Sequence, residues 1–431
     1  GVGPGHHDPS EQFPYNPYRS GEVVAEGKGT AVPLWLIALF LSIFTFYTDD
    51  HVIAGILPEL AAGLSVSEAV AGQLVTVFSL TIALVTPLAG LLLSHVARRA
   101  VVLTALAAFT AANLAATAVD SYAVMVGLRI AAALAAAAAT PLIFASTAEL
   151  APPERRGRYL SVLAIGVTGS IAFGVPLGSW IGTSLNWQAT FGTMAGLGAV
   201  SLLLVALFLP ATEPSVPLPL KQQLRALSAR PILLALTGGG LAIMGSIMLL
   251  TYLVPYLQGV LSAGDGVRSL VFSVLGIAGT VGVFAGGYAT DRLGADRTIR
   301  LGLGLFIVVV LALAALWWIR PVSLALFLPL VALWGALAYL SSPAVQTRLH
   351  QVAGDLTAQA LAFNTSFGYL GIALGGALGG VIVSRVGAGW LPVATAVTSV
   401  LALGLITLAF RQPSSPTAVP RGADHKQGAP Q

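Results

Sequence analysis

The chain has 431 residues, of which 56% are hydrophobic and only 9% are charged. A soluble globular protein carries about 25% charged residues, so this chain has too little polar surface for a fold that is surrounded by water. A soluble enzyme, a disordered scaffold and a nucleic-acid-binding protein are therefore excluded, although the net charge is +4. The sequence has no cysteine, which rules out disulfides and thiolate metal sites, and it predicts neither a metal nor another cofactor.

Twelve apolar segments follow one another along the chain. Each is long enough to cross a bilayer core about 30 Å thick, which takes roughly 20 helical residues. The predicted spans are 33–58, 68–93, 100–119, 121–148, 157–182, 187–210, 231–258, 267–290, 298–319, 321–345, 357–385 and 388–411. Open strands cannot cross lipid, and these segments are too long for barrel strands. The predicted fold class is an all-α polytopic membrane protein, with a capping box from Ser65 to Glu68 opening the second span.

Polar segments divide the chain into two halves of nearly equal length. Residues 1–32 and 412–431 are polar tails, and the basic, proline-rich stretch 211–230 separates a first half, 33–210, from a second, 231–411. Of the 21 Lys and Arg residues, all but a few fall on one side of the predicted topology. Because positive residues concentrate in cytoplasmic loops, we expect a multi-pass protein of a bacterial inner or plasma membrane, with both termini and the linker in the cytoplasm.

A short motif occurs twice at a constant offset. Gly287-Tyr-Ala-Thr-Asp291-Arg292-Leu-Gly294 lies between the eighth and ninth spans, and Gly90-Leu-Leu-Leu-Ser94-His95 lies between the second and third. Two six-span halves that share a motif and are joined by a basic loop are typical of internally repeated transporters.

With these motifs the chain resembles the major facilitator superfamily, and within it the branch of drug:proton antiporters and arabinose-type sugar-efflux permeases. The Gly-x-x-x-Asp-Arg-x-Gly loop is a signature of that superfamily and is complete only in the second half, since Ser94 and His95 replace the usual Asp and Arg. Further matching segments are Leu128-Arg129, Pro153 to Arg158, Gly174-Val-Pro176-Leu-Gly178, Gly55 to Pro58, Thr251 to Leu257, and Asn364 followed by Gly371, Gly375 and Gly379. The resemblance covers 33–411 and implies two six-helix repeats in a transporter that functions as a monomer.

Ionisable residues within the predicted spans are few. Each costs roughly 2.5–3.5 kcal/mol on insertion scales, so each needs a reason. Asp49 and Asp50 lie in the first span and Arg129 in the fourth, and Asp50 and Arg129 are both about 12 Å from the outer end. The resemblance implies that both spans border a central cavity. We predict Asp50 as the main proton carrier, Asp49 as its modulator and Arg129 as their partner, whereas the alternative is a static pair that orients two helices.

His51 follows these carboxylates directly. An imidazole titrates near neutral pH and could relay protons. The alternative is a polar side chain that only satisfies a hydrogen bond near the helix mouth.

The motif residues predict conformational roles. An aspartate at a helix end can meet the N-terminus of another helix favourably, and Arg98 and Arg99 are candidate counter-charges, although arginines in such loops also set topology. Small residues and prolines permit close helix approach and bending. The candidate gate residues are Gly90, Ser94, Arg98, Arg99, Gly287, Asp291, Arg292, Gly174, Pro176 and Gly178.

A substrate cavity is predicted from aromatic and amide side chains. The candidates are Tyr47, Phe78, Asn113, Tyr252, Tyr256, Trp334, Phe363, Asn364 and Phe367. A wall with several aromatic residues and few charges suits neutral or lipophilic solutes, or sugars.

The sequence therefore predicts a proton-coupled antiporter that exports small organic solutes, such as drugs or sugars, by alternating access. Its expected partners are the solute, protons and the lipid bilayer. A proton-linked uptake symporter for a small nutrient is the alternative, and a receptor that does not transport is a further one. An intramembrane enzyme is disfavoured, because the chain has no His-Glu-x-x-His, Gly-x-Ser-x-Gly or nucleotide-binding motif.

Overall fold

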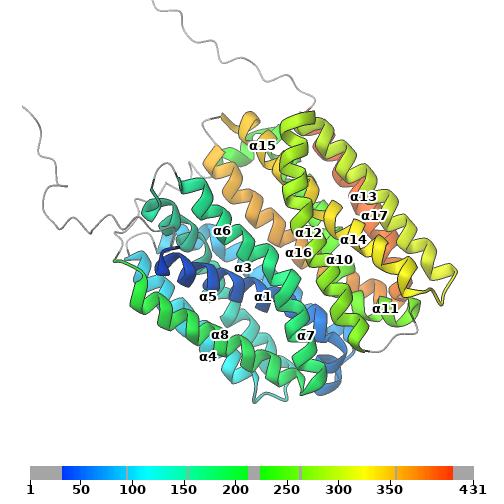
Figure 1. Cartoon of the computed structure of the whole chain (residues 1–431), viewed down its shortest axis with the longest axis horizontal. Helices are drawn as coiled ribbons and strands as arrows, with labels where there is room; N and C mark the ends of the chain where they lie inside the picture. Colours follow the sequence, from blue (N-terminus) through cyan, green and yellow to red (C-terminus); the bar gives the residue numbers. More distant parts are fainter. Residues whose placement is uncertain are drawn as a thin grey trace, which may run out of the picture. The chain divides into compact units, whose positions relative to one another are not determined.

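The structure, a computed structural model, describes residues 32–93, 96–152, 155–211, 224–261, 265–354 and 357–410. In these ranges the chain forms helices and turns without strands (Figure 1). Twelve helical spans in the described residues are long and apolar enough to cross a membrane. The predicted polytopic α-helical fold is thus confirmed.

The helices follow the predicted spans closely, with several spans divided into shorter pieces. The first half contains α1 (Leu34–Gly63), α2 (Glu68–Ala71), α3 (Gln73–Leu92), α4 (Arg98–Ala116), α5 (Tyr122–Leu150), α6 (Arg156–Gly169), η2 (Ser170–Gly174), α7 (Val175–Ser184) and α8 (Trp187–Phe208). The second half contains η3 (Arg225–Ser228), α10 (Arg230–Thr251), α11 (Leu253–Val260), α12 (Asp265–Leu293), α13 (Ala295–Trp318), α14 (Leu324–Leu340), α15 (Ser342–Ala353), α16 (Thr357–Arg385), η5 (Ala388–Trp390) and α17 (Leu391–Phe410).

Prolines account for the most important interruptions. Helix α1 kinks at Ile56 (φ −123°, ψ 17°), two residues before Pro58. Helix α10 ends at Thr251, and the next residue, Tyr252 (φ −106°, ψ 27°), lies three residues before Pro255. Proline lacks an N–H, and its ring collides with the carbonyl one turn earlier, so an α-helix bends or breaks on its N-terminal side. In the fifth span a π-helical turn, η2, stands immediately before α7, whose first turn contains Pro176.

The cap of α2 differs from the prediction. Ser67, not Ser65, is the N-cap residue, and its Oγ accepts a hydrogen bond of 3.3 Å from the backbone N–H of Val70. Ser65 instead adopts a left-handed conformation with φ 55°, and the neighbouring Val66 N–H bonds to the carbonyl of Ala61. The prediction of a cap at Ser65 is wrong because this residue closes α1 rather than opening α2.

Helices of the two halves pack directly on one another. Helix α3 lies against α16, α12 lies against η2, α7 and α6, and α1 reaches α10, α11 and α12 (Figure 1). At one point the backbones themselves touch, because a Cβ on Gly276 of α12 would overlap the backbone of Ala172 in η2. One hydrophobic cluster accordingly contains residues of both halves, among them Leu57, Val75, Met248 and Trp334.

Candidate functional site

Helix α1 is held in place by a ladder of glycines on its neighbour. Gly174, Gly178 and Gly182 follow one another at four-residue spacing, through the end of η2 and along α7, and a Cβ on each would overlap Thr48, Val52 and Ile56 of α1, respectively. Residues four apart lie on one face of a helix, so this face lets the two backbones approach closely. The predicted role of Gly174 and Gly178 in close helix approach has this geometry; their role in movement stays a prediction.

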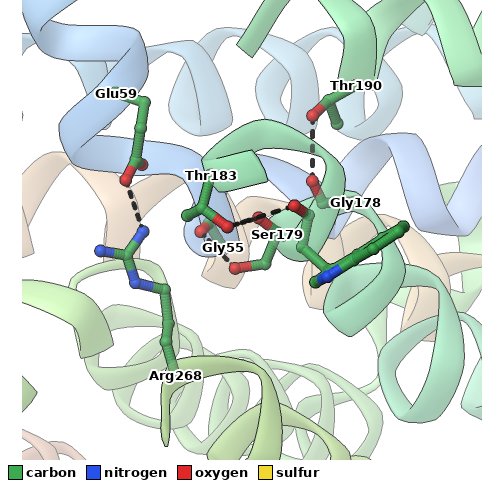
Figure 2. Close-up of polar contacts among 8 residues, drawn as sticks. Gly55, Glu59, Gly178, Ser179, Thr183, Thr190 and Arg268 are labelled. Atoms are coloured by element: carbon green, nitrogen blue, oxygen red, sulfur yellow. Dashed lines mark hydrogen bonds and ion pairs between the residues drawn. The ribbon is translucent and has the colours of Figure 1, made fainter. Parts of the chain in front are cut away.

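Hydroxyl groups of α7 and α8 bind carbonyls in the same region, as Figure 2 shows. The Oγ of Ser179 donates to the carbonyl of Gly55 at 2.8 Å, next to the kink at Ile56. The Oγ1 of Thr190 donates to the carbonyl of Gly178 at 2.9 Å. A kink leaves carbonyls without their helical partners, and side-chain donors can satisfy them. Ser179 therefore stabilises α1 at its broken turn.

A buried ion pair joins α1 to α5. The Nη1 of Arg129 lies 2.7 Å from Oδ2 of Asp49, and its Nη2 donates to the backbone carbonyl of Asp49 at 3.0 Å. The guanidinium also lies over the ring of Phe78, 4.2 Å from the centroid. The side chains are 2% and 0% exposed, so this is a fully enclosed charge pair, which needs a partner for each charge.

The structure thus brings Arg129 to Asp49, whereas similar depth had suggested Asp50. Successive residues on a helix point about 100° apart, so only one of the two carboxylates can face α5. Asp50 faces a small void instead, with room for about one water molecule. The void lies between the halves and is lined by Asp50, His51, Ala54, Val75, Ile247, Leu250, Thr251 and Ile372.

Asp50 is buried without strong partners. It is 2% exposed, and within the described part of the chain neither of its carboxylate oxygens has a hydrogen bond of ordinary geometry. The phenol of Tyr369 on α16 lies beside it and beside the phenol of Tyr47 on α1. Tyr47 and Tyr339 on α14 act on Asp50 through longer-range electrostatics. Of two adjacent acids, one is thus held by a guanidinium and the other faces the interface between the halves.

His51 is anchored by its own helix. Its Nδ1 lies 2.8 Å from the carbonyl of Tyr47, and because a carbonyl only accepts hydrogen bonds, this nitrogen carries the proton. The ring lines the Asp50 void, so its predicted role as a relay has a suitable place, and the role itself stays a prediction.

The arginines of the first motif bind within their own half. Arg98 forms an ion pair with Glu149 at the end of α5, and Arg99 donates through Nη2 to the carbonyl of Ala206 in α8 at 2.7 Å. They tie the start of α4 to two neighbouring helices. Gly90 lies in α3, and Ser94 lies outside the described residues.

The second motif is found at an exposed helix end. Asp291 and Arg292 are exposed near the end of α12, and Arg292 lies over the ring of Tyr288 at 4.9 Å. Asp291 borders an open groove that Asp296 and Arg348, a pair at 2.8 Å, also line. A Cβ on Gly287 would meet open space. The conformational role of this motif stays a prediction.

The predicted cavity residues are spread over several places. Tyr47 and Phe78 belong to the aspartate site described above. The amide of Asn113 donates to the carbonyl of Phe109 in its own helix at 3.2 Å. Tyr256 donates to the carbonyl of Leu313 at 2.6 Å and stacks on Trp317.

Four more of these candidates lie in the second half. Trp334 is buried in the cluster that contains residues of both halves, and Phe363 and Phe367 pack against a cluster formed by second-half residues. Asn364 approaches Gly239 on α10. The structure therefore does not gather the predicted residues around one space, and their contact with a substrate stays a prediction.

Tyr252 closes one end of the interface between the halves. Its hydroxyl donates to the carbonyl of Gly376 on α16 at 3.0 Å, and Nε2 of Gln73 on α3 donates to the same carbonyl at 3.3 Å and to that of Ala69 at 3.1 Å. A Cβ on Gly72, Gly379 or Gly380 would overlap the Tyr252 ring or its hydroxyl. We call the group of Tyr252, Gln73, Ala69 and Gly376 the Tyr252 clasp.

An ion pair also joins α1 to α12. The Nη1 of Arg268 lies 2.7 Å from Oε1 of Glu59 (Figure 2). Sequence reasoning missed this pair and the clasp, because Glu59 and Arg268 are 209 positions apart and the hydrogen bonds to Gly376 join residues 124 and 303 positions apart. The signal for Arg268 was available: it is one of the few arginines on the side of the predicted topology that is poor in positive charge.

With the fold and the site described, the amino-acid sequence can be compared with those of known proteins. A sequence profile of the Major Facilitator Superfamily matches residues 39–375. The chain belongs to the Major Facilitator Superfamily. It is a multi-pass membrane protein of a family of transporters, as the sequence motifs indicated.

Curated relatives cover most of the chain. An uncharacterized MFS-type transporter of Bacillus subtilis (strain 168) is 32% identical over 354 residues, 82% of this chain and 90% of the relative. A chloramphenicol resistance protein of Streptomyces lividans is 32% identical over 331 residues, 76% of this chain and 83% of the relative. A probable sugar efflux transporter of Helicobacter pylori (strain G27) is 26% identical over 382 residues, which are 86% of this chain and 95% of the relative. Relatives of this superfamily transporter thus include efflux-type proteins.

Proposed function

We propose that this transporter exports small organic solutes in exchange for protons, with Asp50 as the proton carrier. The observation that carries the proposal is the difference between the surroundings of two adjacent buried acids. Asp49 is neutralised by Arg129, whereas Asp50 lies in a void between the halves without a hydrogen bond of ordinary geometry among the described residues.

The difference divides the work between the two acids. A buried ion pair is strongly destabilised when one partner is lost, so Asp49 and Arg129 are suited to hold α1 against α5 throughout a transport cycle. Asp50 can gain or lose a proton without breaking that pair. Ionisable groups within a membrane span are functional by default, and a carboxylate at an interface that opens alternately to each side meets water from both sides in turn.

The cycle we propose is a rocking of the six-helix halves, 33–210 and 231–411, about the interface that contains Asp50. The Tyr252 clasp and the Glu59–Arg268 pair would seal one side of this interface, and the other side would open toward the arginine-rich loops. Positive residues concentrate in cytoplasmic loops, so we infer that both termini are cytoplasmic. The transporter would work as a monomer in a bacterial inner or plasma membrane.

The substrate class we propose is neutral or lipophilic organic solutes, including drugs and sugars. Two relatives support it by their names, a chloramphenicol resistance protein and a probable sugar efflux transporter. The interior of the helical spans is also poor in charge, which suits such solutes better than ions.

The test is transport in proteoliposomes with an acidic lumen, using labelled chloramphenicol and arabinose as probes and a pH-sensitive dye to screen further solutes. Antiport predicts that protons leaving the lumen drive the solute in, and that Asp50→Asn reduces this uptake to that of protein-free vesicles. The control variant is Asp120→Asn, which changes an exposed acid in a loop and should transport normally. Full pH-driven transport by Asp50→Asn would remove Asp50 from the mechanism, and solute leaving with the protons would indicate symport.

A further inference from the structure

One face of α16 connects the aspartate site to the Tyr252 clasp. Tyr369, Ile372, Gly376 and Gly380 follow at spacings of three or four residues, which places them on one side of the helix. Ile372 lines the void that contains Asp50. The carbonyl of Gly376 accepts hydrogen bonds from Tyr252 and Gln73, and Gly380 lies against Gln73.

Tyr369 reaches into the first half. Among the described residues, it is the one second-half side chain buried in the hydrophobic cluster that Phe46, Phe78 and Ala133 also form. The side chain is 8% exposed, and its phenol lies beside the carboxylate of Asp50 and the phenol of Tyr47. A hydroxyl that belongs to α16 is thus placed next to an acid that belongs to α1.

The other groups around Asp50 are engaged or more distant. Asp49 and Arg129 are paired with each other, and His51 is bonded through Nδ1 to the carbonyl of Tyr47. Tyr339 on α14 interacts with Asp50 only through longer-range electrostatics. Among the described residues, Tyr369 is therefore the hydrogen-bond donor of the second half that lies beside Asp50.

From this geometry we propose that Tyr369 is a positioning residue for Asp50, which donates its phenol proton to the ionised carboxylate and thereby ties α16 to α1. The proposal rests on the proposed function, and it adds the element through which the second half responds to the proton. A hydrogen bond to an ionised acceptor is about twice as strong as one between neutral groups. Protonation of Asp50 therefore weakens the tie.

The consequence reaches the clasp through the helix itself. Tyr369 and Gly376 are seven residues apart, which is about 10 Å along a helix. With Asp50 ionised, Tyr369 holds α16 against α1, and Gly376 stays in reach of Tyr252 and Gln73. With Asp50 protonated, α16 is released and the clasp opens more often. Coupling of this kind needs an element whose position both sites bias, and α16 contacts both.

The first measurement is an infrared pH titration of the full chain in liposomes. A carboxylic acid band that disappears in Asp50→Asn reports the protonation of Asp50. Tyr369→Phe keeps the ring and removes only the hydroxyl, and we expect it to move the midpoint of this band to higher pH by about one unit, the size of a hydrogen bond to a charged group. Tyr339→Phe is the matched control, because it removes a more distant phenol that acts on Asp50 only through longer-range electrostatics, and it should leave the midpoint unchanged.

The second measurement follows the clasp. The chain has no cysteine, so a single Thr76→Cys, next to Gly376, reports opening through its rate of maleimide labelling. The rate is divided by that of an exposed Asp120→Cys, which corrects for the pH dependence of the thiol. We expect the corrected rate to rise about tenfold on acidification through the Asp50 midpoint, and Tyr369→Phe to remove this rise.

Two outcomes overturn the proposal. One is an Asp50 midpoint in Tyr369→Phe that equals that of the wild-type protein and of Tyr339→Phe. The other still applies if Tyr369→Phe does not fold. It is a corrected labelling rate of Thr76→Cys that does not change with pH in the otherwise wild-type protein, or that is the same with and without Asp50→Asn. Failure of the proposed function has a different signature, an Asp50 band that titrates normally while no pH gradient drives any solute.

Discussion

The first helix of each half breaks near a proline, and the two breaks serve different purposes. Pro58 and Pro255 are 197 residues apart, the same offset that separates Gly90 from Gly287. Helix α1 kinks at Ile56, whereas α10 stops at Tyr252 and α11 begins. The repeat therefore provides a weak turn at the same place in both halves.

The side chains around the two breaks divide the chemistry. Asp50 of α1 corresponds at this offset to Ile247 of α10, and both line the same void. At the breaks themselves, Gly55 only accepts a hydrogen bond from Ser179. The hydroxyl of its counterpart Tyr252 bonds to Gly376 of its own half and, across the interface, lies 3.4 Å from the carbonyl of Ala69 and 3.5 Å from Nε2 of Gln73. The first half thus contributes the ionisable groups and the second contributes the closing contact, so a duplicated scaffold has kept its bends while its two copies have specialised.

Among these variants, removal of Arg129 from the first half should have the largest effect on stability. Arg129→Met leaves Asp49 as an uncompensated buried acid, and we expect it to lower the free energy of unfolding by about 3–5 kcal/mol. Neutralising both partners, in Asp49→Asn/Arg129→Met, should recover most of that loss, because no charge is then left unpaired. Thermal unfolding of the purified variants measures both effects. A loss below about 1 kcal/mol for the single variant would mean that the pair is not needed to hold α1.

The glycine ladder beneath the kink should give an intermediate effect. A Cβ in Gly178→Ala overlaps Val52, and we expect a destabilisation of about 1–3 kcal/mol, typical of overpacking. Gly196→Ala is the matched control: it lies in α8, where a Cβ meets open space, and alanine favours a helix over glycine. The two variants should shift the unfolding temperature in opposite directions, and equal shifts would contradict a close α1–α7 contact.

The Tyr252 clasp should give the smallest effect on stability and a distinct one on opening. Tyr252→Phe removes the hydroxyl whose contacts with Ala69 at 3.4 Å and Gln73 at 3.5 Å cross the interface, so we expect a loss of only about 0.5–1.5 kcal/mol. Labelling of the single cysteine in Thr76→Cys should nevertheless become faster by up to about tenfold, because the same free energy now favours the open clasp. Tyr256→Phe, which removes a comparable bond within the second half, should not change the labelling rate.

Much of the fold was predictable because the signal is local. Twelve apolar segments and the prolines within them follow from hydropathy and backbone chemistry, and the scarcity of charge in the spans singled out Asp49, Asp50 and Arg129. What hydropathy does not specify is rotation about the helix axis. Depth alone paired Arg129 with Asp50, whereas a turn of about 100° per residue brings it to Asp49.

The remaining site residues depend on contacts between distant segments. Tyr369 stands among small residues of α16, in Gly368-Tyr369-Leu370-Gly371, and only the packing of α16 against the first half shows that its phenol reaches Asp50. Tyr252 looked like a cavity residue because aromatic side chains line many pockets, but three glycines from two helices form a socket for it. Arg98 and Arg99 were candidate counter-charges of the gate; the structure shows their contacts with Glu149 of α5 and the carbonyl of Ala206 in α8, and the gate role stays a prediction.

The contact between Gly276 and Ala172 has a mechanical meaning. Two helices that meet through bare backbone have no interlocking side chains to disengage, so they can pivot there without any rotamer change. The two helices cannot slide past each other as easily, because the residues next to this contact have side chains on both helices. In the rocking cycle that we propose, a fulcrum of this kind would confine relative motion to a tilt, which would widen one mouth of the interface as it narrows the opposite one.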